Sequence, residues 1–409
     1  MKIAVIDQLG NYGGVSRVIK NLLPALKKKN SNLEIEYFSN FEAIKREKLD
    51  FFLKSTDIKI KYLEFDRFSS SAVIRFLKLN KFIIKLQNKF KNILSFLPLF
   101  LSGNLKKEIE KKIINYDLVL FPWPYLIDLP KLNCPIVAIF HDFNFKYYFS
   151  SQPTYFPNQL KHLNEQIPIW LKNTHIVVSN YFIKNEIKKF YPKLKKKINI
   201  INLAPYSESI LNTKNKKINK YFSFKYILCP TNLCSHKNLG ILFSAFFNVL
   251  KEFPEIKLVL TGPYTSLING ASSSIGVELS EKKKNIIGLG YVSDYKLENL
   301  ILNSLMVISP SLYEADNGPC TDAWFHSIPV AMAKIPSNLE HIKNQKVYAS
   351  LFDPSNYISI SNSILKIIKN YKYYKKRAAI SKKNITKNYT WEITASGYCN
   401  LFKEINDHK

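Results

Sequence analysis

The sequence lacks several features, and each absence narrows the class of protein. Among its 409 residues there are five cysteines, and no two of them form a Cys-x-x-Cys pair. A disulfide framework or a zinc site is therefore not expected, and a reducing compartment is the default. No run of ~18–20 apolar residues occurs, so no membrane span is expected. Residues 1–7 are too short an apolar run for a signal peptide and predict a strand instead.

Acidic residues and arginine are scarce, which leaves a strongly basic chain. It has 60 Lys and Arg against 31 Asp and Glu, a formal net charge of +29, and only five of the basic residues are arginine. A coding sequence biased towards A and T would give such a lysine-rich composition. Alternatively, the charge attracts the protein to an anionic membrane, nucleic acid or glycan. The sequence leaves both explanations open.

The chain is long and apolar enough for more than one packed core. Hydrophobic residues make up 46% of it and aromatic residues 14%. Since single cores stop growing well below this length, two domains are expected. No internal repeat stands out, and residues 206–222, rich in Ser, Asn and Lys, predict a linker.

The most informative stretch lies between two expected strands, Leu305–Ile308 and Pro329–Ala333. An acid, Glu314, follows the first strand, and a turn at 316–319 precedes a helix predicted for 319–326. Asn317 or Gly318 suits the N-cap of this helix, and Pro319 suits its first position. In open α/β sheets, ligands bind just beyond the carboxyl ends of strands, and helix N-termini favour phosphate. The pattern therefore predicts an anion-binding site here.

Two other stretches place polar residues directly after an expected strand. Residues 3–7 are followed by the glycine-rich loop 8–14 and then by a helix predicted for 15–28. This order is typical of a phosphate-approaching loop, although the spacing does not fit G-x-G-x-x-G. Lys237 follows the strand predicted at Tyr226–Cys229, where a fixed ammonium can stabilise a departing diphosphate.

These residues resemble glycosyltransferase family 4, the retaining enzymes of the GT-B fold. Glu314 and Asp322, with Gly318-Pro319 between them, resemble its Glu-x7-Glu motif, although the second acid is Asp here and Ser327 replaces a glycine before the next strand. Gly13-Gly14 followed by Val15-Ser16-Arg17 resembles the family's first loop. The resemblance covers most of residues 226–402 and only a few points of 1–205.

The resemblance implies roles for individual residues. Glu314 would bind hydroxyl groups of the donor sugar, Lys237 would stabilise the leaving diphosphate, and His141 would lie near the phosphates and the acceptor hydroxyl. Asn232 and His236 occupy the places of the family's usual arginine, so one cation is missing or is replaced by a pH-dependent one. The donor-binding set predicted in this way comprises Gly13, Gly14, Asn232, His236, Gly262, Tyr291, Asn317, Gly318, Pro319 and Asp322.

Each of these residues also has a purely structural explanation. Acids beside a helix start are favoured by the helix dipole, which alone accounts for Glu314 and Asp322. Gly13-Gly14 can form an ordinary tight turn, and His141 can be a structural loop residue. A lysine in a chain so rich in lysine has little weight except for its position after a strand.

The fold implied by the resemblance is α/β: a GT-B protein with two Rossmann-like domains whose parallel sheets face a central cleft. Residues 1–205 would bind the acceptor and residues 223–385 the nucleotide-sugar, joined by the linker at 206–222. Residues 386–409 would form a helix that crosses back to the N-terminal domain. No Asp-x-Asp motif stands in a plausible place, so neither a metal nor any cofactor besides the donor substrate is expected.

The predicted function is transfer of a hexose-type sugar, with retention, from a nucleotide-diphosphate sugar to a glycan or lipid-linked acceptor in cell-surface polysaccharide or lipopolysaccharide synthesis. The protein would be cytoplasmic, with the basic amphipathic region 72–115 binding the inner face of the membrane or, alternatively, packing on the core. Nucleic acid is not an expected partner. Two alternatives remain: a nucleotide-sugar epimerase, and a basic binding protein that has lost catalysis on the same fold.

Overall fold

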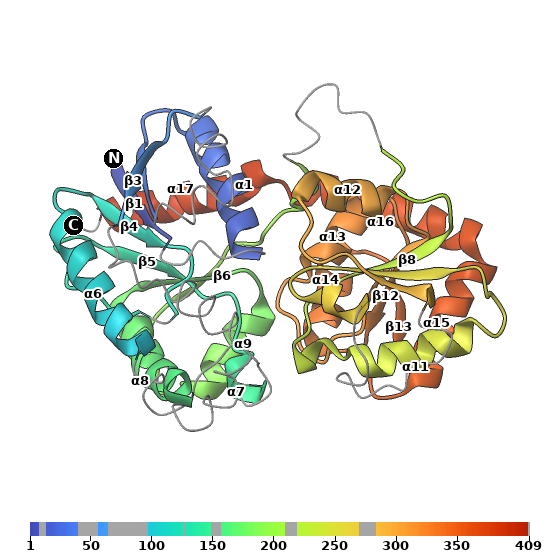
Figure 1. The fold of residues 1–409 in the computed structure, drawn as a ribbon. Helices are drawn as coiled ribbons and strands as arrows, with labels where there is room; N and C mark the ends of the chain where they lie inside the picture. Colours follow the sequence, from blue (N-terminus) through green and yellow to red (C-terminus); the bar gives the residue numbers. More distant parts are fainter. Residues whose placement is uncertain are drawn as a thin grey trace. The chain divides into compact units, whose positions relative to one another are not determined.

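The computed structural model describes residues 1–7, 14–39, 56–63, 97–125, 127–148, 157–208, 219–269 and 284–407. The chain divides into two compact units, each built around one parallel sheet (Figure 1). Unit 1 comprises Met1–Phe145, Thr154–Ile201 and Ala395–Lys409, and unit 2 comprises Lys146–Pro153 and Asn202–Thr394.

Unit 1 contains a seven-stranded sheet with the order β3-β2-β1-β4-β5-β6-β7. All its strands run parallel, and the central strands are buried, as expected for the continuous apolar runs of a sheet covered on both faces. The strands are β1 Lys2–Ile6, β2 Glu34–Ser39, β3 Lys59–Tyr62, β4 Leu118–Phe121, β5 Ile136–Ile139, β6 His175–Val178 and β7 Ile198–Ile200.

The helices of unit 1 follow from apolar spacing and from their end residues. In α1, buried Val18, Leu22 and Leu26 recur every four residues on one face, and three lysines near its carboxyl end suit the helix dipole. Asn180 caps α9 by accepting a hydrogen bond from the Ile183 amide at 2.9 Å. The helices are α1 Gly14–Lys29, α6 Leu97–Lys112, α8 Pro157–Asn173 and α9 Tyr181–Phe190.

Unit 2 contains a six-stranded parallel sheet with the order β10-β9-β8-β11-β12-β13. Its strands are β8 Tyr226–Pro230, β9 Lys257–Thr261, β10 Ile286–Gly288, β11 Met306–Ser309, β12 Val330–Ala333 and β13 Ser350–Phe352. Its helical segments are η2 Ser235–Lys237, α11 Leu239–Val249, η3 Thr265–Asn269, α12 Asp294–Leu302, α13 Gly318–Phe325, α14 Pro336–Gln345, α15 Tyr357–Lys369 and α16 Tyr371–Asn388.

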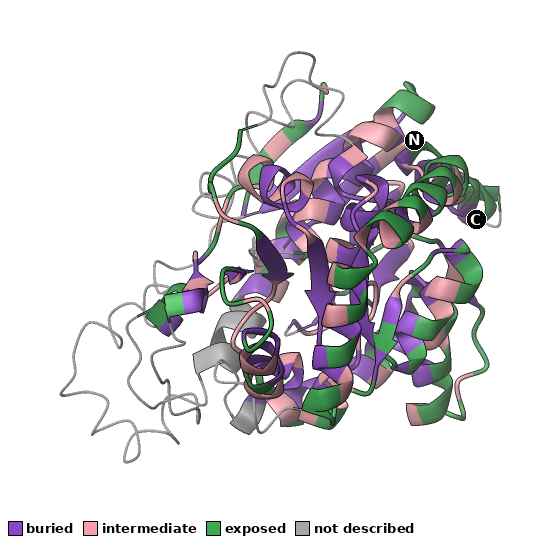
Figure 2. Ribbon diagram, turned by 90° about the vertical axis from the view of Figure 1, so that its right-hand side faces the viewer, coloured by how far each residue is buried: buried purple, intermediate pink, exposed green. Residues whose placement is uncertain are grey.

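Successive residues of a strand point to opposite faces of the sheet, and this alternation builds two cores in unit 2. Ile227 and Cys229 of β8 pack with α11 and α15. Tyr226 and Leu228, on the opposite face, pack with α12 and α13. The strands are accordingly buried, while exposed residues gather on helices and loops (Figure 2).

The predicted pair of Rossmann-like halves with parallel sheets is confirmed, but the units divide the chain at other points than the expected boundaries. Unit 2 begins at Asn202 rather than after the linker, and it also includes residues 146–153. Helix α16 runs through the expected 385/386 boundary to Asn388. The last helix, α17 (Trp391–Asp407), begins in unit 2 and continues in unit 1 from Ala395, and the short helix α7 (Phe145–Tyr148) also contains a boundary.

Two predicted segments, the basic region 72–115 and the linker 206–222, lie partly outside the described residues. Of the basic region 72–115, residues 72–96 lie outside the described residues, as do residues 209–218 of the predicted linker. Within the described ranges, none of the helices combines the length and the apolar character needed to cross a bilayer. All five cysteines are described, and none of them forms a disulfide with another.

Candidate nucleotide-sugar site

The candidate site lies where the strand order of unit 2 reverses. From β8 the chain proceeds outward to β9 and β10, and it then returns to place β11 on the other side of β8. The connections after β8 and β11 therefore lead away in opposite directions, and their loops meet at the carboxyl edge of the sheet. Open α/β sheets bind ligands at such a reversal point.

The loop after β8 is held by the side chains of two asparagines. The Asn232 side chain accepts a hydrogen bond from the Cys234 amide at 3.0 Å, which forms a tight turn before η2. Asn238 adopts the left-handed conformation, with φ of 58°. Its amide donates to the carbonyl oxygens of Pro310 at 3.1 Å and Pro354 at 2.8 Å. Asn238 thus joins the loops that follow β8, β11 and β13.

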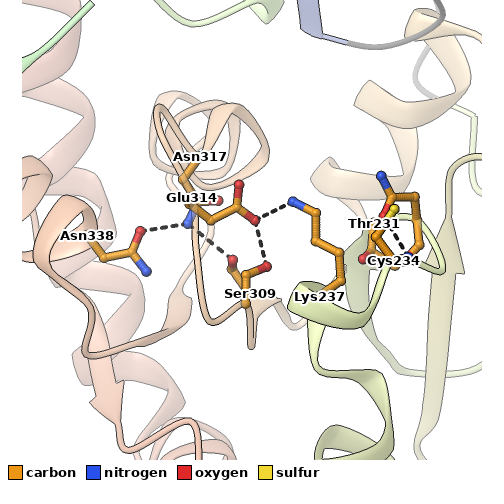
Figure 3. A network of polar contacts seen from close by, with 9 residues as sticks. Thr231, Cys234, Lys237, Ser309, Glu314, Asn317 and Asn338 are labelled. Atoms are coloured by element: carbon orange, nitrogen blue, oxygen red, sulfur yellow. Dashed lines mark hydrogen bonds and ion pairs between the residues drawn. The ribbon is translucent and has the colours of Figure 1, made fainter. Parts of the chain in front are cut away.

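Lys237 and Glu314 form an ion pair across this reversal point (Figure 3). The Lys237 Nζ lies 2.6 Å from Glu314 Oε1, and each side chain is 17% exposed. Ser311 donates to the same Oε1, also at 2.6 Å. Glu314 Oε2 makes no hydrogen bond with any residue in the described part of the chain. The carboxylate is therefore anchored by one oxygen and retains a second oxygen that can accept from a ligand.

The electrostatics of the pair favour an ionised carboxylate. Burial alone would raise the pKa of Glu314, but the Lys237 ammonium and the hydrogen bonds from Lys237 and Ser311 outweigh it, so that the pKa is lowered. Burial, aided by the adjacent Lys237 charge, lowers the pKa of His236 to about 4. His236 is therefore neutral at pH 7. Of the two explanations left open for the absent arginine, a missing cation is the one that fits.

The turn before α13 is built differently from the predicted N-cap. Asn317 does occupy the N-cap position, but in the left-handed conformation and without a side-chain hydrogen bond to the helix. Its amide donates instead to Ser309 Oγ at 3.1 Å and to Asn338 Oδ1 at 2.9 Å (Figure 3). Asn338 in turn donates to the Ala333 carbonyl at 2.9 Å. This buried network fixes the start of α13, where Gly318 and Pro319 are the first two residues.

Gly262 and Tyr291 lie on the loops that follow β9 and β10. Gly262 has φ of +125°, and an added Cβ would lie 1.8 Å from the Thr231 carbonyl oxygen. Only glycine allows this approach between the loops after β8 and β9. The Gly262 amide also donates to the Gly290 carbonyl at 2.8 Å. Tyr291, the next residue, is 45% exposed. Gly262 therefore lies on the loop next to the one that carries Lys237, and Tyr291 lies on the next loop beyond it.

Asp322 is fully buried on α13, and one of its contacts is with the connecting segment that opens unit 2. Its Oδ1 accepts a hydrogen bond from the Ser207 amide at 3.0 Å. At the start of the same helix, an added Cβ on Gly318 would lie 2.4 Å from the ring of Tyr206. The Tyr206 ring stacks on Trp391, with ring centroids 6.2 Å apart. The second acid of the motif thus holds the segment around Ser207 against α13, and its predicted ribose contact stays a prediction.

The remaining predicted residues belong to unit 1. Gly13 lies outside the described residues, and Gly14 is the first residue of α1. His141 follows β5 and is half-buried, with its Nε2 2.8 Å from the Pro122 carbonyl oxygen. A carbonyl only accepts, so Nε2 carries a proton in this contact. The roles predicted for these residues stay predictions.

Several residues that build the site were not predicted. Ser311, Asn238 and Asn338 hold the charged and turn residues in place, and His341 on α14 contacts the Ala315 carbonyl through Nε2 at 3.2 Å. Burial lowers the pKa of His341, so it is neutral and donates to that carbonyl. Ser311 could have been noticed from its place three residues before Glu314. The others contact residues far away in the sequence, and no local pattern marks them.

A model of the family described as "Glycosyl transferases group 1" matches residues 212–387. The match covers nearly all of unit 2, including both loops that carry Lys237 and Glu314. The candidate site therefore lies in the part of the chain that has the sequence pattern of group 1 glycosyltransferases.

Individual proteins that are similar to this chain are also described as glycosyltransferases. An uncharacterized glycosyltransferase, MJ1607 of Methanocaldococcus jannaschii, is 22% identical over 242 residues, which are 57% of this chain and 60% of the relative. The matched region thus spans less than two thirds of that relative. Among solved structures, Alr3699/HepE of Anabaena in complex with UDP and glucose has a TM-score of 0.64 and 13% identity, covering 99% of this chain and 100% of that one.

WaaG, a glycosyltransferase involved in lipopolysaccharide biosynthesis, has a TM-score of 0.66 and 9% identity, covering 98% of this chain and 99% of that one. At such identities the structural similarity shows the fold alone. The chain therefore has two parallel-sheet Rossmann-like halves that match GT-B glycosyltransferase structures. Together with the family match, this supports a glycosyltransferase of the GT-B type.

Proposed function

We propose that this protein transfers a hexose-type sugar from a nucleotide-diphosphate sugar to a glycan or lipid-linked acceptor, with retention at the anomeric carbon. The observation that carries the proposal is the Lys237–Glu314 pair at the strand reversal of unit 2. A cation and an anchored carboxylate occur together there, beside the first turn of a helix. The cation and the N–H groups of the helix's first turn can bind a diphosphate, and the carboxylate can accept hydrogen bonds from the sugar.

Each charged group would act on a different part of the donor. Lys237 has three protons and gives one hydrogen bond to Glu314, so two remain for phosphate oxygens as negative charge develops on the leaving group. Glu314 Oε2 would accept from sugar hydroxyl groups, and the turn at 317–319 would hold phosphate or sugar. Asp322 positions the Ser207 segment through Oδ1, and its contact with ribose remains part of the proposal.

The finer points of the proposal have indirect support. Retention, by attack from the face of the leaving group, follows from the resemblance to family 4, and no metal is assigned to the step. UDP is the first nucleotide to test because HepE, which shares the fold, has been solved with UDP and glucose. An acceptor in cell-surface polysaccharide or lipopolysaccharide synthesis is supported by the similarity to WaaG. In unit 1, His141 is proposed to act on the acceptor hydroxyl, and Gly14 keeps its predicted role in binding the donor.

The test has a binding step and a transfer step. Thermal unfolding with UDP, GDP, ADP and their sugars identifies the nucleotide, because a ligand that binds the folded state raises the melting temperature. Transfer to glycan and lipid-linked acceptors is then measured by mass spectrometry for the wild type and Glu314→Gln. A nucleotide-dependent shift and a transferred hexose in the wild type alone support the proposal. Epimerised donor without transfer would support the epimerase, and no response to any nucleotide would contradict both.

A second candidate, a binding protein without catalysis, is favoured by one observation. The neutral state of His236 leaves Lys237 as the cation assigned to the diphosphate, and Glu314 already neutralises it. Such a protein would bind nucleotide-sugar, and its bound donor would be neither hydrolysed nor transferred over the whole acceptor panel. Equal inertness of the wild type and Glu314→Gln would establish this alternative.

A further inference from the structure

Helix α16 lies in a long stretch of unit 2 without an acidic residue. Between Pro354 and Trp391 there is no Asp or Glu, while nine residues are basic. The nine are Lys366, Lys369, Lys372, Lys375, Lys376, Arg377, Lys382, Lys383 and Lys387. The charges of this segment alone produce a local positive potential.

The basic residues of α16 are not spread evenly around the helix. At about 100° per residue, one arc of about 100° holds four lysines and two apolar residues. We call this set the α16 face: Lys372, Tyr373, Lys376, Ile380, Lys383 and Lys387, all of them exposed. The opposite side carries the buried residues Ala378, Ser381 and Ile385, of which Ile385 joins the core shared with α12 and α13.

The lysines of the α16 face are not used inside the protein. None of the four forms an ion pair with any residue in the described ranges, whereas Lys369, just before α16, pairs with Glu252 at 2.8 Å. Burial, and to a lesser degree the nearby charge of Lys382, lowers the pKa of Lys375 on the same helix. Helix α16 has no acidic residue of its own, so the face presents positive charge that the helix does not compensate.

The apolar residues of the face are also exposed, and one is held in place. Tyr373 is 53% exposed and Ile380 is 41% exposed. Arg377 donates from Nε to the Tyr373 hydroxyl at 3.1 Å and lies over the Tyr373 and Tyr348 rings at 5.1 and 4.6 Å. Arg377 is thereby occupied with aromatic rings, and Tyr373 is oriented along the face. Lysines that flank exposed Tyr and Ile form the pattern of a helix lying at a bilayer surface.

We propose that the α16 face binds an anionic phospholipid bilayer, with the four lysines contacting head groups and Tyr373 and Ile380 entering the interface. A lysine ammonium on its long stem can stay at head-group level while the shorter apolar side chains go deeper. Nucleic acid fits less well, since the arginine of this helix stacks on its own tyrosines and an aliphatic side chain stands among the lysines. The residues of the α16 face are distinct in sequence from the region 72–115.

The test measures binding of the full-length protein to vesicles by co-sedimentation. Neutral phosphatidylcholine vesicles are compared with vesicles that contain about one third phosphatidylglycerol, at low and at moderate salt. The α16 variant changes Lys372, Lys376, Lys383 and Lys387 to Gln. The matched control changes four exposed lysines of unit 1, Lys28, Lys188, Lys193 and Lys195, to Gln, and so removes the same charge.

The wild type and the control are expected to bind anionic but not neutral vesicles, within about twofold of each other, and the α16 variant at least about tenfold more weakly. A variant with Tyr373→Ser and Ile380→Ser should bind about threefold more weakly. Unchanged melting temperatures show that all variants are folded.

Equal binding by the α16 variant and the wild type, or equal losses in both lysine variants, overturns the proposal. So does a wild type that binds single-stranded RNA but not anionic vesicles. Because neither donor nor acceptor is present, the result is independent of the proposed activity.

Discussion

The two sheets follow the same strand order apart from the additional strand β7 in unit 1, but their carboxyl edges carry different contacts. In unit 2, the loops at the strand reversal are joined by an ion pair, by Asn238 and by the Asn317–Asn338 contact. In unit 1, the loop after β1 lies outside the described residues, and the predicted residue His141 contacts a backbone carbonyl. The same architecture thus has an ion pair at the edge of unit 2 and a histidine–carbonyl contact at the edge of unit 1. The loops, and not the sheets, therefore decide the function.

The largest expected effect tests how tightly the edge of unit 2 is built. Gly262→Ala should lower the free energy of unfolding by about 4 kcal/mol, because a Cβ would overlap the Thr231 carbonyl at a positive φ. Gly240→Ala is the matched control, since a Cβ there meets nothing within 4 Å, and a helical alanine should stabilise by up to about 1 kcal/mol. Urea unfolding measures both, and similar values for the two would refute the tight loop approach.

The second-largest expected effect compares the Lys237–Glu314 ion pair of the candidate site with an exposed ion pair elsewhere in unit 2. Glu314→Gln should lower kcat/KM about 100-fold, because it removes the carboxylate that holds the sugar and leaves Lys237 without its counter-charge. Glu252→Gln breaks the exposed pair with Lys369, whose side chains are 45% and 51% exposed, and should leave kcat/KM unchanged. Steady-state kinetics decide this. A comparable loss of kcat/KM in both variants would contradict a specific role of Glu314 in the reaction.

A third effect concerns pH. The pKa of His236 is about 4 in the folded protein and 6.5 in the reference state, so the unfolded chain binds more protons between these values. The contribution of His236 to stability is complete above pH 6.5 and is lost as the pH falls towards 4. Between pH 7 and pH 5 the loss should be about 2 kcal/mol. His236→Asn should show a smaller loss over that interval in urea unfolding. An identical pH dependence of wild type and variant would contradict the buried neutral state.

The smallest effect addresses unit 1. If His141 acts on the acceptor side, His141→Gln should lower the transfer rate about tenfold through one lost polar contact. The melting-temperature shift caused by the nucleotide should stay the same, because the diphosphate is assigned to Lys237 in unit 2. Loss of that shift in His141→Gln would place a nucleotide contact at His141 and contradict its assignment to the acceptor.

Much of the fold and part of the site were predictable from local patterns. Continuous apolar runs mark the buried strands, such as 226–229 and 305–308, because parallel strands covered on both faces need no alternation. Lys237 and Glu314 were both predicted, since each follows such a strand, and strands that end at one edge bring their loops together. They lie 77 positions apart in the sequence, and Lys237 Nζ is 2.6 Å from Glu314 Oε1 in the structure.

The rest depends on tertiary packing, which leaves no local trace. The pairing of Lys237 with Glu314, rather than of each with solvent, depends on the Asn238 and Ser311 contacts. Buried Asp322 contacts the Ser207 segment, 115 positions away. The spacing of the two acids could not reveal this, because it is the same whether the second acid faces a ligand or the interior.

The most direct measurement is a calorimetric titration of the wild type, Lys237→Met and Lys251→Met with UDP, GDP and ADP. Lys251 is exposed just after α11 and serves as the charge-matched control. We predict that one nucleoside diphosphate binds the wild type and Lys251→Met alike, and binds Lys237→Met at least about tenfold more weakly. Equal binding to Lys237→Met and the wild type, or no binding of any of the three nucleotides, would contradict the assignment of the site.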